Sequence, residues 1–314
     1  MAITLCGTQV GANTGPIPCD FTRGLPKVLM LGSASFSSSD YADVATMDAA
    51  ILSKLKLPTG SSQKLYPFPA IQGTTDQTEA AKFGNSGYGL RYKMAASVPA
   101  YEFQVIAGST LEKKLLAFDG TNSPLLILDD KGQIWGAMNG TNYEGSVWQV
   151  SVEPHAYADG QNPKFTLINI SLVNADDFVR NAYAYKTGLN SSSLRGLKDG
   201  QLVELSHSTN VYKIKVKIPV SGLNQDLDVW DDYGALIAAL TFSAGTGANY
   251  GTSLAITSVA ADNTLKALTV TFDSSAFTAL ASLTKIRLSS PLPAVLDAAG
   301  VTQLEIAPVI ITKP

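Results

Sequence analysis

The sequence predicts a mainly β protein, in which an N-terminal β-sandwich or barrel with one or two flanking helices is followed by a second β-sandwich. Short apolar runs alternate with turn residues through most of the chain, and only two segments show clear helical spacing. Within Val211 to Val220 the even positions are all apolar and the three lysines occupy odd positions. With 314 residues, 45% of them hydrophobic, the chain is long enough for two cores.

Residues 1–24 are rich in Gly, Asn and Pro, and we expect an N-terminal arm that ends near Arg23. Cys6 and Cys19 flank this arm and could close a short loop in an oxidising compartment, so their pairing stays open. The first residues have no basic segment before a long apolar one. We therefore expect no signal peptide, no membrane span, and a soluble protein made in a cytoplasm.

Residues 25–188 form the predicted assembly domain, which opens with a buried strand over Leu25 to Phe36. A helix is then expected, because one face of it collects apolar side chains at spacings of three and four. We expect serines or Asp40 to cap its start and Pro58 to end it. The apolar face consists of Val44, Met47, Ile51 and Leu55.

A polar stretch from Pro69 to Gly89 reads as a long projecting loop. Asp76 and Glu79 stand three apart, as in a capping box, which predicts a short helix within the loop. Glycines 84, 87 and 89 frame its far end. Loops of this length inside a domain are usually functional or assembled against a partner.

The next segments, up to Ser171, read as strands joined by turns, and 111–118 is among the predicted strands. Asp130, Lys131 and Gly132 supply the tight turn of a hairpin over Leu125 to Met138. Residues 174–188 end the domain and are expected to be helical, with Phe178, Ala182 and Tyr185 on one side.

Residues 189–210 are rich in Ser, Gly and Asn and are the expected linker. Residues 211–314 then show short strands with turns about every ten residues, which predicts a C-terminal immunoglobulin-like β-sandwich. The alternating lysines of 211–220 are interpreted as the solvated face of a strand. Pro219 supports this interpretation, because proline is confined mostly to sheet edges or bulges, where lysines also deter unwanted pairing.

Residues that carry chemistry are scarce, so we expect no enzyme and no cofactor. His155 and His207 are the only histidines, and no nucleophile motif, phosphate-binding loop or zinc-ligand spacing is present. Asp231 and Asp232 lie in a segment that loosely resembles a calcium loop but lacks its glycine and final glutamate. A net charge of −3 makes tight binding of nucleic acid unfavourable.

The order of elements resembles the tail-tube proteins of long-tailed bacteriophages, some of which carry a C-terminal immunoglobulin-like domain. The resemblance covers most of the chain in layout and rests on no invariant motif. It implies stacked, hexameric rings around a lumen that lets DNA pass without binding it, in a virion assembled in a bacterial cytoplasm. Val28 to Leu31 and the strands from Leu90 to Val173 would line the lumen.

The resemblance also implies contacts between subunits. The arm would bridge neighbouring subunits, and the loop around Thr74 to Lys82 would reach the adjacent ring. The residues expected at these contacts are Arg23, Thr75, Asp76, Glu79, Lys82 and Tyr88.

Two other classes of function stay open. A capsid auxiliary, a decoration protein or a head-to-tail connector would need similar assembly surfaces. A surface or carbohydrate-binding module built on two sandwiches would instead present exposed aromatic side chains. For such a module, the three tryptophans of the chain are more typical of core or interface anchors than of sugar platforms.

Overall fold

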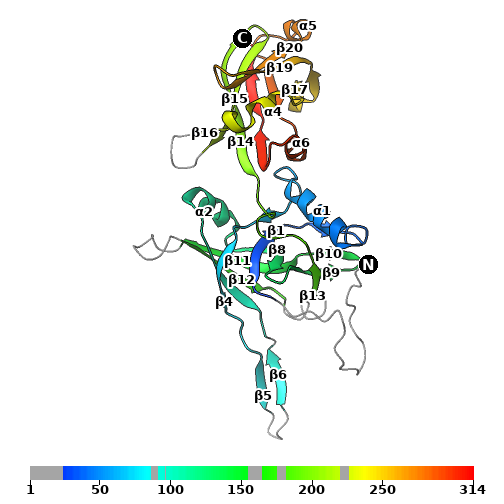
Figure 1. Cartoon of the computed structure of the whole chain (residues 1–314). Coiled ribbons are helices and arrows are strands. Elements are labelled where there is room, and N and C mark those ends of the chain that lie inside the picture. Colours follow the sequence, from blue (N-terminus) through cyan, green and yellow to red (C-terminus); the bar gives the residue numbers. More distant parts are fainter. Residues whose placement is uncertain (1–23, 86–90, 96, 155–164, 175–181, 220–225) are drawn as a thin grey trace. The chain divides into compact units, whose positions relative to one another are not determined.

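The computed structural model describes residues 24–85, 91–95, 97–154, 165–174, 182–219 and 226–314 (Figure 1). The protein is mainly β, with 48% of its residues in strands and 17% in helices, as predicted. It divides into two compact units. The first extends to Gly196, and the second comprises Leu197–Pro314 together with Lys56–Pro58.

The first unit is built on one branched, eleven-stranded sheet, and its path runs β2-β10-β9-β8-β11-β12-β7-β4. Strand β1 pairs with β3 and β8, and β13 pairs with β9. All pairs in this sheet are antiparallel. The strands are β1 Pro26–Leu31, β2 Ser35–Phe36, β3 Tyr66–Pro67, β4 Ile71–Asp76, β7 Ala100–Val105, β8 Thr121–Asp129, β9 Gln133–Asn139, β10 Asn142–Glu144, β11 Ser146–Pro154, β12 Thr166–Leu172 and β13 Ala182–Lys186.

Strands β1 and β8 carry apolar side chains on both faces, and a separate core lies on each face. On one side Leu29 and Leu125 pack with residues of β7, β11 and β12. On the other, Val28 and Leu126 pack with helix α1 (Val44–Leu55) and with Tyr143 of β10. The continuous apolar run of the first predicted strand is explained by this burial on both faces.

The predicted helix is present as α1, and Met47, Ile51 and Leu55 of its apolar face are buried. The expected cap is wrong, because the carboxylate of Asp43 accepts the backbone N–H of Thr46 at 2.8 Å. Asp40 instead accepts the N–H of Ser37 in the preceding turn. The hydrogen bonds from Thr46 lower the pKa of Asp43.

Two other predicted elements are corrected. Residues 111–118, expected as a strand, form helix α2 (Ser109–Leu115) followed by the 3-10 helix η1 (Leu116–Phe118). Leu, Glu and Lys favour the helix, and Leu115 is the side chain that it buries. Residues 182–186, expected as helix, form β13 because they pair with β9. Phe178 lies outside the described residues.

The second unit is a sandwich of two sheets. Its larger sheet runs β19-β20-β15-β14-β22, with β16 beside β15, and its smaller sheet runs β18-β17-β21-β23. The larger sheet contains β14 Lys198–Ser208, β15 Val211–Pro219, β16 Asp226–Asp228, β19 Ile256–Asp262, β20 Ala267–Phe272 and β22 Leu304–Ala307. The smaller contains β17 Ser243–Thr246, β18 Thr252–Leu254, β21 Lys285–Ser289 and β23 Val309–Thr312. Helices α4 Trp230–Ala238, η2 Ala248–Tyr250, α5 Ser274–Thr278 and α6 Pro293–Ala298 connect the strands.

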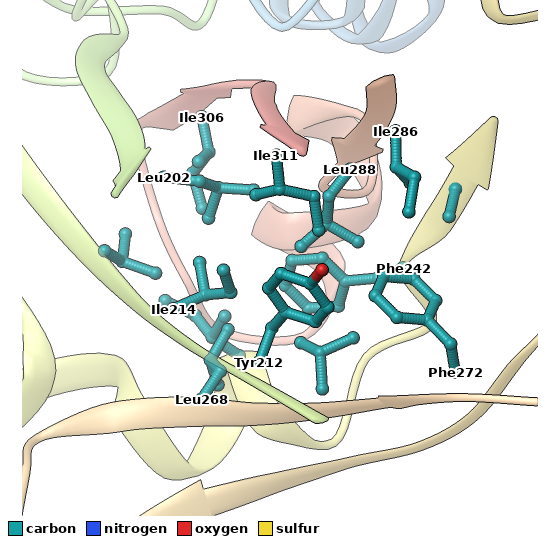
Figure 2. Packing of buried hydrophobic residues seen from close by; sticks show 14 of the residues in the cluster. Leu202, Tyr212, Ile214, Phe242, Leu268, Phe272, Ile286, Leu288, Ile306 and Ile311 are labelled. Atoms are coloured by element: carbon teal, nitrogen blue, oxygen red, sulfur yellow. The ribbon is translucent and has the colours of Figure 1, made fainter. Parts of the chain in front are cut away.

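These orders match an immunoglobulin-like sandwich. The order β14-β15-β20-β19 corresponds to strands A, B, E and D, and β17-β21-β23 to C, F and G. The core fills the space between the sheets, where Tyr212 and Leu268 of one sheet meet Leu288 and Ile311 of the other (Figure 2). The predicted sandwich is therefore confirmed.

Strand β15 has the predicted alternation, since Tyr212, Ile214 and Val216 are buried and the lysines between them are partly exposed. Of the edge or bulge expected from Pro219, the edge is wrong, because β14 and β20 pair with the two sides of the strand. Pro219 is tolerated as the last residue of the strand, where the ladder ends.

The predicted linker 189–210 is also corrected. The division between the units falls within it, after Gly196, but Lys198–Ser208 is strand β14 of the second unit. Its Ser and Gly content suggested a loop. Pairing with β15 and with β22 overrides that local preference.

Candidate assembly surface

The expected projecting loop is a β-ribbon. Strand β4 pairs with β7, the N–H groups of Gln77 and Glu79 bond to the carbonyls of Ala100 and Val98, and β5 (Lys82–Asn85) then pairs with β6 (Arg91–Ala95). Figure 1 shows β5 and β6 extending away from the main sheet beyond β4. At about 3.3 Å per residue, the stretch from Asp76 to Asn85 spans about 30 Å. The short helix predicted around Asp76 and Glu79 is wrong, because cross-strand hydrogen bonds use this backbone.

Four of the expected interface residues lie along one strand of this ribbon. Thr75 and Asp76 end β4, Glu79 bridges to Val98, and Lys82 begins β5; all four are exposed. Arg23 and Tyr88 lie outside the described residues, as do Cys6, Cys19 and His155. The structure thus brings together the four that it describes.

The polar groups of the ribbon chiefly shape its backbone. Asp76 accepts the N–H of Thr78 at 2.9 Å, and hydrogen bonds from the side chain and backbone of Thr78 lower the pKa of Asp76. Glu79 and Lys82 approach to 3.9 Å, but both side chains are 73% exposed. An exposed ion pair of this kind contributes little stability. These residues therefore set the path of the ribbon more than its affinity for a partner.

The side chains best suited to anchor a contact were missed by the sequence reasoning. Phe83, Tyr92 and Met94 are more than half exposed at the outer part of the ribbon. Gly84 lies opposite Tyr92, and a Cβ built at Gly84 would come within 2.7 Å of the tyrosine ring. The glycine therefore lets the ring lie flat across the strand. The alternation of Tyr92, Lys93 and Met94 could have indicated a strand with Tyr92 and Met94 on one face. Alternation alone does not show whether the rest of the protein covers that face.

A second feature is the solvent-facing side of the main sheet. Ser151, Asn169, Glu102 and Thr75 are cross-strand neighbours in one row that crosses β11, β12, β7 and β4. The row beside it contains Gln149, Ser171 and Asn122. Hydroxyl and amide groups therefore dominate this face, which we call the polar sheet face. Its apolar members include Val147, Pro124, Ala100 and Leu167.

The charge of the polar sheet face is one-sided. Strands β4, β7, β8, β11 and β12 contain no lysine or arginine. Glu102 and Glu153 face outward, and at the border Asp119 accepts hydrogen bonds from the N–H of Val152 at 2.9 Å and from Ser151 at 3.1 Å. These bonds lower the pKa of Asp119, so its charge persists in mild acid. The face therefore presents weak negative charge on a neutral polar background.

Little in the described part of the chain resembles a catalytic centre. Among these residues no group of three His, Cys, Asp or Glu side chains is placed to hold a metal ion. No described helix has the length and apolarity to cross a bilayer. On the polar sheet face, a shallow depression of about 270 Å³ is lined by polar groups that include Gln77, Gln149 and Asn169.

Fold and surface together define a two-unit, mainly β protein with a projecting ribbon and a cation-free polar sheet face. No protein-family model matches the chain, and neither does any curated protein or solved structure with which it was compared.

Proposed function

We propose that this protein is a structural subunit of a bacteriophage virion, most specifically a tail-tube subunit that forms stacked rings around a DNA-conducting lumen. The observation that carries the proposal is the polar sheet face, which spans five strands without a lysine or arginine. We expect hexameric rings, other virion proteins as partners, and no catalytic activity.

The polar sheet face suits the wall of a DNA channel. Non-specific binding to DNA requires cations that replace the counterions of its phosphates. This face offers hydroxyls, amides and the carboxylates of Glu102 and Glu153, which give DNA no strong site at which to stop. The alternating pattern that creates it also buries Phe103, Val150 and Ile168 on the reverse side, so the wall is backed by a firm core.

The ribbon suits a contact between copies. A two-stranded ribbon is marginally stable by itself in water, and large apolar side chains on its surface gain free energy when a partner covers them. Tyr92 and Met94 combine large contact area with high exposure, as interface anchors do. If the ribbon of one copy binds a different surface of the next copy, the association is head-to-tail. Repeated head-to-tail contacts build rings or tubes.

The test is negative-stain electron microscopy of the purified protein across a concentration series. Rings or tubes of uniform width are the expected result. Monodisperse monomers at high concentration would overturn the tube and favour a decoration protein or a surface module. A single ring that never stacks would instead favour a head-to-tail connector.

A further inference from the structure

A separate concavity of about 340 Å³ lies on the second unit, between the solvent side of α4 and the turn that joins β19 to β20. Helix α4 contributes Trp230, Asp231 and Asp232, and the turn contributes Asn263 and Lys266. Its volume lies at the lower end of the range found for small-molecule sites.

The apolar wall of the concavity is held in place by a glycine. A Cβ built at Gly234 would lie 2.5 Å from the indole of Trp230, so the ring rests directly on the helix backbone. Trp230 is 8% exposed and belongs to the core of the second unit, so only a small part of its surface lines the concavity. Leu236, which is 42% exposed, adds further apolar surface.

The polar wall is fixed by the turn. Asp262 accepts the N–H groups of Thr264 and Leu265, both at 3.1 Å, and this holds the backbone on either side of Asn263. Lys266, at a φ of 50°, then donates to Asp231 at 2.7 Å and joins the turn to the helix. Hydrogen-bond donors and acceptors of α4 and of the β19–β20 turn thus lie together at the rim of the concavity.

The chemistry of the rim selects among ligand classes. The ammonium of Lys266 already neutralises Asp231, which disfavours a metal ion. Two carboxylates against one ammonium disfavour phosphates and other anions. Acidic residues in the first turn of α4 also stabilise the helix, but that does not account for Asn263 and Lys266 on the facing turn.

We propose that this concavity binds a neutral saccharide. Sugar hydroxyls donate to carboxylates and accept from an ammonium or amide, and the rim offers all three groups. The C–H surface of a sugar ring would pack mainly against Leu236, with Trp230 contributing the small part of its surface that is exposed. The proposal concerns the second unit and does not depend on assembly through the first.

The full-length protein should first be screened on an array of neutral and anionic oligosaccharides, and hits measured by isothermal titration calorimetry. Binding to a neutral glycan is expected. Asp232→Asn and Asn263→Ala should each weaken it roughly tenfold, the effect of losing a strong hydrogen bond. Asp199→Asn is the control and should leave the affinity for the glycan unchanged. Asp199 lies on β14, which is separated from β19 by β20 and β15.

Each outcome decides the proposal. Binding to no glycan, binding to anionic glycans alone, or affinity that survives both variants would overturn it. Circular dichroism of the variants shows that any loss is not due to unfolding. Ring formation by the same samples reports on the proposed function separately.

Discussion

The buried carboxylate of Asp129 accepts a hydrogen bond of 2.9 Å from the indole N–H of Trp135, across the β8–β9 turn. The same carboxylate accepts the backbone N–H groups of Gly24, Lys131 and Gln133 at 2.9, 3.0 and 2.8 Å. Asp129 is 3% exposed. One side chain therefore organises the turn, the neighbouring tryptophan and Gly24, the first of the described residues.

Replacement of Asp129 should destabilise the first unit strongly. Asp129→Ala leaves four N–H donors without this acceptor in a buried site, and we expect a loss of about 2–4 kcal/mol in the free energy of unfolding. Asp130→Ala is the matched control, because its carboxylate accepts one N–H from Leu25 at an exposed site. Urea unfolding checks both, and equal losses would contradict the role assigned to Asp129.

The ribbon anchors should control assembly. Tyr92→Ser with Met94→Ser should raise the protein concentration needed for rings by about tenfold or more, because each anchor contributes on the order of 1–2 kcal/mol. Leu205→Ser, at a 44% exposed position of β14, is the control. Sedimentation velocity measures the shift, and rings that form at the wild-type concentration would show that the ribbon is not the contact.

A positive charge on the polar sheet face should create an affinity for DNA. Asn169→Lys places an ammonium at the centre of that face, and we expect duplex DNA to bind weakly at low salt and to dissociate as salt rises. Ser258→Lys adds the same charge at an exposed position of β19, outside the polar sheet face, and is the control for the place of the charge. Fluorescence anisotropy is the measurement. Tight binding by the wild-type protein would contradict a passive channel wall.

The effect of removing the second unit on ring formation should depend on the residue at which the chain is ended. A chain ending at Gly196 keeps both cores of the first unit and should still form rings. A chain ending at Asn210 retains β14 without β15, which exposes Leu202, and it should aggregate. Light scattering distinguishes the two. Loss of rings in the shorter chain would place the second unit within the assembly contact.

Alkaline pH should destabilise the second unit through Tyr212. Burial, and next the charge of Glu204, raise the pKa of Tyr212 to about 12 from about 10. The folded state thus holds this proton more tightly, so the stabilisation is full below about pH 10 and is lost as pH rises through about 12. Tyr212→Phe should flatten this part of the curve of unfolding free energy against pH. An unchanged slope would exclude the tyrosine as its source.

The spacing of apolar residues was sufficient to predict the type of element where that element buries only one of its faces. The alternation predicted for Val211 to Val220 is seen over the described residues Val211–Pro219, and the three-and-four spacing of Met47, Ile51 and Leu55 is seen in α1. Each element buries a single face. The turn at Asp130 to Gly132 also follows from its residues, and Gly132 has a φ of 71°.

By itself, then, the sequence determined a mainly β protein with a C-terminal sandwich, one amphipathic helix, and few groups for catalysis. Tertiary structure decided that 182–186 is a strand, that Lys198–Ser208 belongs to the second unit, and that the polar stretch after Ile71 is a paired ribbon. It also decided which side of β12 faces solvent and which side chains gather there. The physical reason is that strand pairing joins residues distant in the chain, and those partners set the burial that local spacing cannot specify.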